Sequence, residues 1–311
     1  MQRSGDRVMT GIVLMLGFCL FAPLIDVSSK LATATVSVGI ITLGRYVVQG
    51  ALMAPVLYLG RFPGGMSRRG AQLVFWRSLA SVLSTLTFVR AVAVMPIADA
   101  LAIAFVEPFI ILLAGRIFFA EQVGPRRIAA CAVGFAGALL VIQPSFSEFG
   151  LVALLPVGTA ISFAAYMMIT REASLHVAPE AMQFHTAWMS ALICLPLLAA
   201  GGLWQIADLA PVLPQGIAWA WVAGVGVAAT VSHLMMTYAF RFAASSVLAP
   251  LHYLEIVSAA TLAWAVFGDF PDLLTWCGIG VIVASGLYII YREHVVSRGL
   301  KARPAAAPAA E

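Results

Sequence analysis

Charged side chains are scarce in this sequence. They make up 10% of its 311 residues, whereas 62% are apolar; an average soluble domain has about a quarter charged and about half apolar residues. This shortage of charge excludes an ordinary water-soluble fold. The apolar residues fall into runs of about 18 to 25, the helix length that crosses a hydrocarbon layer about 30 Å thick. The sequence therefore predicts an all-α integral membrane protein.

The sequence contains only four cysteines, and familiar catalytic motifs are missing. The four cysteines stand alone within apolar runs, in no CxxC or Cys/His spacing, so we interpret them as packing residues. The HExxH, GxSxG and GxxxxGK motifs do not occur. Their absence argues against an enzyme acting on lipid and excludes ATP hydrolysis within this chain. We expect no cofactor and no metal.

Gly, Pro and charged clusters divide the apolar sequence into ten segments, each a candidate membrane span. The segments lie near 9–31, 36–59, 71–94, 97–119, 126–143, 150–170, 181–201, 216–240, 246–267 and 273–291. The first, which follows Arg3 and Arg7, imitates a cleaved signal peptide. We interpret it as an uncleaved span, because many further spans follow at short spacing and its removal would leave an odd number.

Basic residues are unevenly distributed between alternate connecting segments. With the N-terminus in the cytoplasm, outer segments hold only Lys30 and Arg90, and cytoplasmic segments hold fourteen basic residues. The fourteen are Arg3, Arg7, Arg61, Arg68, Arg69, Arg116, Arg126, Arg127, Arg171, Arg241, Arg292, Arg298, Lys301 and Arg303. The positive-inside rule then places both termini in the cytoplasm of a bacterial-type cell inner membrane. This clustering explains the net charge of +4 without a nucleic-acid partner.

The two halves of the sequence resemble each other at an offset of 148 residues. Glu107 then meets Glu255, and Glu121 meets Asp269. Each half contains five expected spans, and an odd number forces the second copy to cross the membrane in the opposite direction. Chance similarity between two alanine-rich segments is the alternative. Inverted repeats are typical of secondary carriers, whose substrate site lies near the membrane midplane between the repeats.

Short motifs occur in the same order in both halves. The first half contains Ser29-Lys30, Arg45, Phe75-Trp76-Arg77-Ser78, Phe105-Val106-Glu107-Pro108, Glu121, Gly134 and Gly137. The second half contains Tyr238-Ala239, Pro250-Leu251-His252-Tyr253-Leu254-Glu255, Phe267-Gly268-Asp269 and Ala284-Ser285-Gly286-Leu287-Tyr288. With these motifs the chain resembles the drug/metabolite transporter superfamily, in particular carriers with two EamA domains.

The resemblance implies a ten-helix fold with both ends in the cytoplasm and a central cavity. The two EamA-like repeats of five helices are expected at 8–143 and 148–292. The remaining tail, 293–311, is basic and then rich in Ala and Pro, with no apolar face to bury. We expect this cytoplasmic tail to be disordered.

Glu107 is the first candidate site residue. It lies about ten residues into its span, about 15 Å deep, where an ionisable side chain is costly and is a functional hypothesis by default. Pro108 removes a helix hydrogen bond beside it and predicts a helix break next to a cavity; a plain packing kink is the alternative. Ile256 stands opposite Pro108 in the second half, so a strictly symmetric mechanism is not expected.

A second acidic group is expected at the equivalent depth of the second half. Glu255 follows His252 by three residues on one helical face, and this pair can bind a cation or pass a proton. The alternative is that His252 only makes the burial of Glu255 tolerable. Pro250 marks a second expected helix break. Tyr238 and Tyr253 flank the segment and are the aromatic candidates for stacking on a flat ring.

Further charged residues within spans complete the predicted site. Asp26 and Lys30 are spaced i,i+4, which favours an ion pair facing the cavity, although Lys30 can instead extend to the outer interface. Arg45 and Arg77 can orient an anionic group through their planar donors, and a cytoplasmic anchor is the alternative for Arg77. The remaining candidates are Asp99 and His233.

Together these features predict a secondary transporter of a small amphipathic organic metabolite, with a central site between inverted repeats. The resemblance implies amino-acid-like compounds, S-adenosyl compounds, riboflavin-like vitamins and drug-like cations as substrate classes. Protons are the candidate coupling ion, the lipid bilayer is the expected medium, and a homodimer is a candidate assembly. An integral-membrane enzyme on lipid substrates, and a channel or scaffold, are the alternatives.

Overall fold

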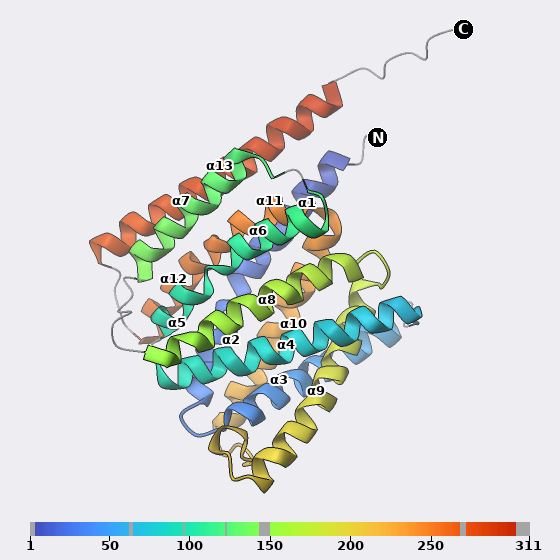
Figure 1. Cartoon of the computed structure of the whole chain (residues 1–311), viewed down its shortest axis with the longest axis vertical. Helices are drawn as coiled ribbons and strands as arrows, with labels where there is room; N and C mark the ends of the chain where they lie inside the picture. Colours follow the sequence, from blue (N-terminus) through green and yellow to red (C-terminus); the bar gives the residue numbers. More distant parts are fainter. Residues whose placement is uncertain are drawn as a thin grey trace.

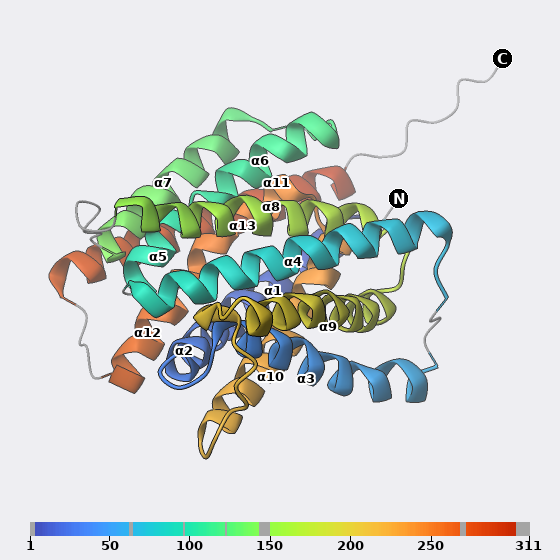
Figure 2. The same ribbon diagram turned by 60° about the horizontal axis from the view of Figure 1, so that its bottom comes forward.

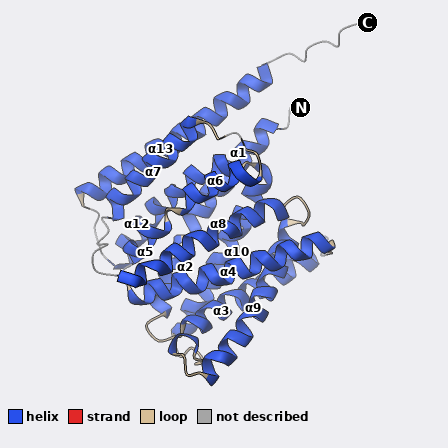
Figure 3. Cartoon of the chain, viewed as in Figure 1, coloured by secondary structure: helices blue, strands red, loops and turns tan. Residues whose placement is uncertain are grey.

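Helices form nearly all of the chain in the computed structural model (Figures 1 and 3). The structure describes residues 4–61, 65–95, 97–121, 123–142, 150–267 and 272–302, and these contain no strand. In a hydrocarbon layer each backbone N–H and C=O must be bonded internally, and a helix satisfies them within one segment. The all-α membrane fold expected from the sequence is confirmed.

The first half contains seven helices in chain order. They are α1 (Ser4–Phe21), α2 (Pro23–Ala32), α3 (Val38–Leu59), α4 (Arg68–Val94), α5 (Ile97–Ala104), α6 (Glu107–Phe118) and α7 (Pro125–Ile142). The second half adds six α-helices and three short 3₁₀ helices. They are η2 (Gly150–Ala153), α8 (Leu154–Ala173), α9 (Pro179–Leu203), η3 (Ala207–Leu209), α10 (Ala218–Phe242), α11 (Ser245–Leu248), η4 (Ala249–Leu254), α12 (Glu255–Phe267) and α13 (Leu273–Ala302).

Within the described residues, nine helical segments are long and apolar enough to cross a membrane. They correspond to nine of the ten expected spans, and α7 occupies the place of the remaining one, near 126–143. The last helix, α13, continues to Ala302. Residues 293–302, which were expected in the disordered tail, are therefore helical, and residues 303–311 lie outside the described part of the chain.

The exterior of the bundle is apolar, and several ionisable side chains are buried. Leu20, Leu83 and Leu192 are exposed, whereas Arg77 and Glu107 are buried. A water-soluble protein shows the opposite distribution. The surface therefore matches a lipid environment. Ionisable side chains buried within a membrane protein indicate that a functional site lies in its interior.

Three of the spans are interrupted near their middle. The first changes from α1 to α2 at Ala22, and the fourth changes from α5 to α6 at Phe105 and Val106. The ninth passes through α11 and the 3₁₀ helix η4 before α12 begins. Pro23, Pro108 and Pro250 each lie in the first turn of the segment after the break, where a missing N–H leaves no bond unmade. The interruption at Pro23 was not expected from the sequence.

The two halves pack against each other symmetrically: exchanging the equivalent helices of the two halves reproduces the same set of helix pairs. α4 lies along α8 and α1 along α10, and these two pairs replace each other when the halves are swapped (Figures 1 and 2). α3 along α9 and α7 along α13 each map onto themselves. This is the pairing expected of two repeats related by a twofold axis, and the inverted direction of the second repeat remains our prediction.

The α7–α13 contact depends on two facing glycines. A Cβ on Gly278 would lie 2.7 Å from the backbone oxygen of Gly137 and 2.8 Å from the backbone nitrogen of Val141. A Cβ on Gly137 would likewise lie 3.1 Å from the oxygen of Gly278. The absence of side chains lets the two helices approach closely, a common device in membrane helix pairs.

We expect Gly278→Ala to destabilise the protein by about 1 to 3 kcal/mol, the usual cost of overpacking. The new methyl group meets backbone atoms, which can give way only if the two helices separate. The matched control is Gly280→Ala on the same helix, because a Cβ there meets no atom within 4 Å. Alanine at 280 should be neutral or stabilising through its better helix propensity. Thermal unfolding in detergent tests the pair, and equal effects at both positions would contradict the close contact.

Candidate functional site

The interrupted spans surround a cavity of about 100 Å³. Helices of both halves line it, and most of its polar residues come from positions far apart in the sequence. The polar lining consists of Asp26, Arg45, Ser81, Ser84, Thr85, Glu107, Thr159, His233, His252 and Glu255. The aromatic lining consists of Phe18, Phe88, Phe105 and Phe163. The cavity thus combines charges of both signs with a largely aromatic wall.

Each of the three carboxylates in the cavity lies in the first turn of a helix that follows a break. Asp26 is in the first turn of α2, Glu107 in that of α6 and Glu255 in that of α12. The N-terminal turn of a helix carries the positive end of the helix dipole, which favours a carboxylate. The breaks therefore create the local field that makes buried acids tolerable at this depth.

His252 joins the two equivalent glutamates of the repeats. Its Nδ1 lies 3.5 Å from Oε1 of Glu107, and its Nε2 lies 2.7 Å from Oε2 of Glu255. All three side chains are buried. The sequence predicted the pairing of His252 with Glu255, and the structure adds Glu107 from the other half. Such a cluster can hold a cation or exchange a proton.

Aromatic rings enclose this cluster. The ring of His252 lies 5.3 Å from that of Phe18, 5.7 Å from Phe105 and 6.0 Å from Phe163, measured between centroids. Rings at these distances exclude water and strengthen electrostatic interactions within the cavity. They also offer flat surfaces for an organic cation or an aromatic ring.

Arg45 and His233 form a second part of the cavity wall, on α3 and α10. Arg45 Nη1 donates to the hydroxyl of Thr85 at 2.6 Å, and Nη2 lies 3.2 Å from Nε2 of His233. Because arginine can only donate, His233 accepts at Nε2 and carries its proton on Nδ1, which lies 2.8 Å from the hydroxyl of Tyr166. Arg45 is buried, and its Nε makes no hydrogen bond to any residue that the structure describes. This wall therefore has donors to offer an anionic group.

Arg77 lies behind this wall rather than in the lining of the cavity. Its side chain is fully buried, and within the described part of the chain its donors reach neutral acceptors on α8, α9 and α10. The acceptors are Thr170 Oγ1 (2.8 Å), Thr186 Oγ1 (2.6 Å), Tyr166 OH (2.6 Å), Gln183 Oε1 (2.6 Å) and Thr237 Oγ1 (3.2 Å). Arg77 thus ties α4 of the first half to three helices of the second.

Several predicted site residues lie elsewhere. Lys30 does not pair with Asp26: its Nζ donates to the backbone oxygens of Val92 and Met95, where the unpaired carbonyls at the end of α4 attract a cation. Tyr238 does not line the cavity, because its hydroxyl donates to Glu180 near the start of α9.

Tyr253 also packs away from the cavity. Its hydroxyl donates to the backbone oxygen of Phe105 at 3.1 Å, and its ring packs against Gly134. Adjacent residues of a 3₁₀ helix point about 120° apart, so the residue after the inward His252 turns outward. The side chain of Asp99 lies outside the described residues.

Sequence reasoning missed the aromatic wall and the Thr85 and Tyr166 hydroxyls. Phe18 and Phe163 stand in long apolar runs, where nothing distinguishes a lining residue from a lipid-facing one. One available signal was Pro23, three residues before Asp26 and inside the first apolar run. A proline so placed resembles the Glu107-Pro108 pair and indicates a third interrupted span.

Comparison with known proteins gives relatives along nearly the whole chain. The EamA-like transporter family matches residues 9–143 and 150–292, one match in each half. The chain is 32% identical to a riboflavin transporter of Rhizobium johnstonii, over 70% of this chain and 71% of the relative. It is 27% identical to an S-adenosylmethionine uptake transporter of Rickettsia bellii, over 80% and 82% of the two chains. It is 25% identical to the pseudopaline exporter CntI of Pseudomonas aeruginosa, over 89% and 94%.

A solved structure has the same fold. One crystal structure superposes with a TM-score of 0.73, over 92% of this chain and 98% of that chain, at 17% sequence identity. At so low an identity the likeness concerns the fold alone.

We expect Tyr166→Phe to lower the stability of the protein by about 1.5 to 3 kcal/mol, because it removes an acceptor from a fully buried charged donor. Arg77 Nη2 and His233 Nδ1 both lose their contact with the hydroxyl. Tyr58→Phe is the control, since Tyr58 is 69% exposed and its replacement should change stability by less than about 0.5 kcal/mol. Thermal unfolding that is the same for both variants would contradict the role assigned to Tyr166.

Proposed function

This chain belongs to the EamA-like transporter family, and from that premise we propose that it carries a zwitterionic organic metabolite through the cavity between its repeats. It is a multi-pass membrane protein and a transporter of a small molecule, not an enzyme. We also propose the substrate class, the coupling ion and the side of the membrane on which the termini lie. Relatives include both uptake proteins and an exporter, so no direction of transport is assigned.

The observation that carries the proposal is the presence of charges of both signs in the lining of one cavity. Asp26, Glu107 and Glu255 face the space from the first turns of α2, α6 and α12, and Arg45 faces it from α3. A substrate with a cationic group near the acids and a carboxylate near Arg45 would satisfy both. A simple anion would be repelled by the acids, and a polyphosphate would need more basic residues than line this cavity.

S-adenosylmethionine fits this description, because it combines an amino-acid group, a sulfonium cation and an aromatic base. Relatives named for its uptake support the proposal. A riboflavin-like flat ring is the second candidate. It is supported by the phenylalanines around His252 and by the 32% identity to a riboflavin transporter.

The cavity must enlarge to accept such compounds. Ligand sites for organic molecules enclose about 300 to 1,000 Å³, and this one encloses about 100 Å³. The structure therefore corresponds to a contracted conformation, and binding requires a second one in which helices of the two repeats move apart. We propose that the positive-inside distribution of basic residues sets the orientation, with both termini in the cytoplasm of a bacterial-type inner membrane.

Protons are the proposed coupling ion. His252 contacts Glu107 and Glu255 within the same buried cluster, so the arrival of a cationic group changes the electrostatic balance of groups that can exchange a proton. Substrate and proton then compete for the same carboxylates. This competition is the simplest way in which one site can couple the two fluxes.

Counterflow in proteoliposomes tests the proposal. We expect labelled S-adenosylmethionine or a zwitterionic amino acid to exchange with its unlabelled form, and an analogue without the carboxylate to exchange about tenfold more slowly. Arg45→Gln should reduce this discrimination by about tenfold, because a charge-assisted hydrogen bond contributes about 1.5 to 3 kcal/mol. Exchange of riboflavin alone would favour the flat-ring alternative. Flux without counterflow would indicate a channel.

We expect Glu107→Gln to lower the rate of transport by about tenfold or more and to remove its dependence on pH, because the amide keeps the shape but cannot exchange the proton. The protein should still fold in the membrane. Glu180→Gln is the control, since Glu180 is also buried but its hydrogen-bond partner is Tyr238 and it does not line the cavity. A wild-type pH profile in Glu107→Gln would exclude Glu107 as the coupling residue.

A further inference from the structure

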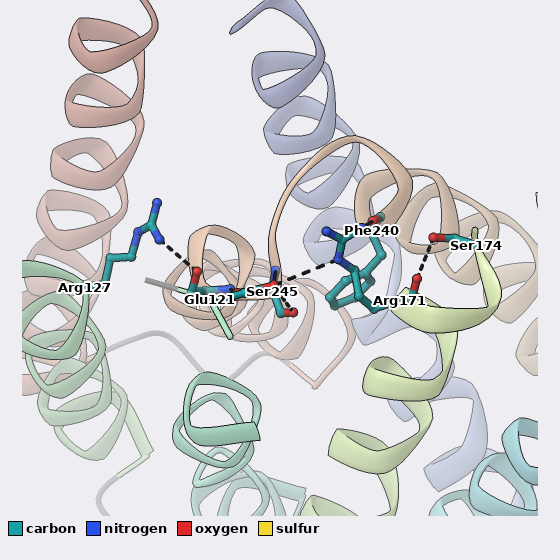
Figure 4. A network of polar contacts seen from close by, with 7 residues as sticks. Glu121, Arg127, Arg171, Ser174, Phe240 and Ser245 are labelled. Carbon is teal, nitrogen blue, oxygen red and sulfur yellow. Dashed lines mark hydrogen bonds and ion pairs between the residues drawn. The ribbon is translucent and has the colours of Figure 1, made fainter. Parts of the chain in front are cut away.

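A second polar cluster lies well away from the cavity, where the end of α10, the start of α11 and the segment after α6 meet the end of α8 (Figure 4). Glu121 is at its centre. Oε1 accepts from the backbone N–H and hydroxyl of Ser245, at 3.1 and 2.9 Å, and Oε2 accepts from the backbone N–H of Ser246 at 2.8 Å. We call this group, with Arg171 and Arg127, the Glu121 cluster.

Two arginines complete the Glu121 cluster. Arg171 Nε lies 4.0 Å from Oε1 of Glu121, and Arg171 Nη1 donates to the backbone oxygen of Phe240 at 3.0 Å. Arg127 Nη1 donates to the hydroxyl of Ser246 at 2.8 Å. Figure 4 shows these side chains converging from separate helices. The cluster therefore connects the segment after α6 with α7, α8, α10 and α11 through bonds to charged groups.

The Glu121 cluster joins the two repeats. Glu121 and Arg127 belong to the first family match, 9–143, and their partners belong to the second, 150–292. In a carrier with one site between two repeats, the contacts that close one end must separate when that end opens. Bonds within a repeat do not have to break in this way.

The chain is adapted to hold the carboxylate of Glu121 in place. A Cβ at Gly115 would lie 3.0 Å from Oε2 of Glu121, so the glycine leaves room for the carboxylate. The backbone N–H of Glu121 also donates to the oxygen of Gly115 at 3.1 Å. Burial raises the pKa of Glu121, but the hydrogen bonds from Ser246 and Ser245 outweigh it and leave the pKa below its ordinary value. The group is thus a carboxylate that only accepts hydrogen bonds.

The path from the cavity to the Glu121 cluster is closed by apolar side chains. α8 carries Phe163 in the cavity lining and Arg171 in the cluster, eight residues and about 12 Å further along. Between these levels Ile111, Met236 and Leu248 are buried in one hydrophobic core. An apolar layer therefore separates the Glu121 cluster from the cavity.

At the opposite end of the bundle, the ion pair between the two repeats is more exposed and therefore weaker. There Arg90 of α4 pairs with Asp208 of η3 at 2.9 Å, and the two side chains are 42% and 38% exposed. An ion pair so exposed contributes little, about 0 to 1 kcal/mol. The Glu121 side chain, in contrast, is 9% exposed, and its carboxylate accepts three hydrogen bonds.

We infer that the Glu121 cluster is the latch that keeps the cytoplasmic end of the substrate path closed, and that Glu121 and Arg171 are positioning residues for the outward-to-inward change. The inference rests on the proposed function and topology. Loss of the latch should shift the protein toward the inward-open conformation without altering the cavity residues. The latch makes no contact with substrate.

Cys19 offers a native probe for this inference. It is 2% exposed, next to Phe18 of the cavity lining, and its Sγ lies 3.5 Å from the backbone oxygen of Leu251. With the other three cysteines replaced by alanine, a membrane-impermeant maleimide reports whether Cys19 is reached from either side. Inside-out and right-side-out vesicles give the two sides separately. The measurement needs no substrate, so it can fail independently of the proposed substrate class.

We expect Glu121→Gln to raise the rate of Cys19 alkylation from the cytoplasmic side by about tenfold, within the usual range of conformational coupling, with no increase from the outer side. Glu180→Gln is the matched control: it is a buried acid near the same end, and its bond to Tyr238 lies within one repeat. An unchanged rate, an equal increase from both sides, or the same increase in the control would overturn the inference.

Two further variants keep the test decisive if Glu121→Gln does not fold. Arg171→Gln and Ser245→Ala each remove one contact of Glu121 and should raise alkylation from the cytoplasmic side in the same direction, by about threefold or more. Size-exclusion profiles in detergent confirm that each variant is folded. Rates at the wild-type level in both variants would overturn the latch.

Discussion

A carboxylate buried within a membrane must meet compensating charge or dipoles, and this requirement shapes the centre of the protein. Asp26, Glu107 and Glu255 each occupy the first turn of a helix that begins inside the bundle. The positive end of the helix dipole stabilises them there. The interruptions that create those helix starts lie inside the protein, where irregular backbone is tolerated within a membrane. The same geometry thus supports the acids and opens the site.

The spans and the principal acids could be predicted from the sequence. Apolar runs gave the helices, and the offset of 148 residues paired Glu107 with Glu255, because both signals are local or repeated along the chain. Contacts across the bundle could not be predicted in this way. Tyr253 shares a segment with His252 but turns away, since η4 is a 3₁₀ helix. Lys30 bonds the end of α4, a partner 62 residues away that no i,i+4 spacing indicates.

In the proposed mechanism the central cavity binds the substrate, and the Glu121 cluster closes one end of its path. The cavity provides charges of both signs within reach of both repeats, and the cluster holds those repeats together at one end. Arg77 adds a third connection, because its buried guanidinium bonds α4 to α8, α9 and α10. His252 and Glu107 lie on η4 and α6, and these are continuous with α11 and with the segment that holds Glu121. Binding and closure are therefore mechanically linked in the proposal.

The most direct measurement of the central claim is an experimental structure with a compound that shows counterflow. We expect the compound in the cavity, with its cationic group near Glu107, Glu255 and Asp26 and its carboxylate at Arg45. We also expect the three acids to remain in the first turns of their helices around an enlarged site. A compound bound outside the cavity, or acids turned toward the lipid, would contradict the proposed function.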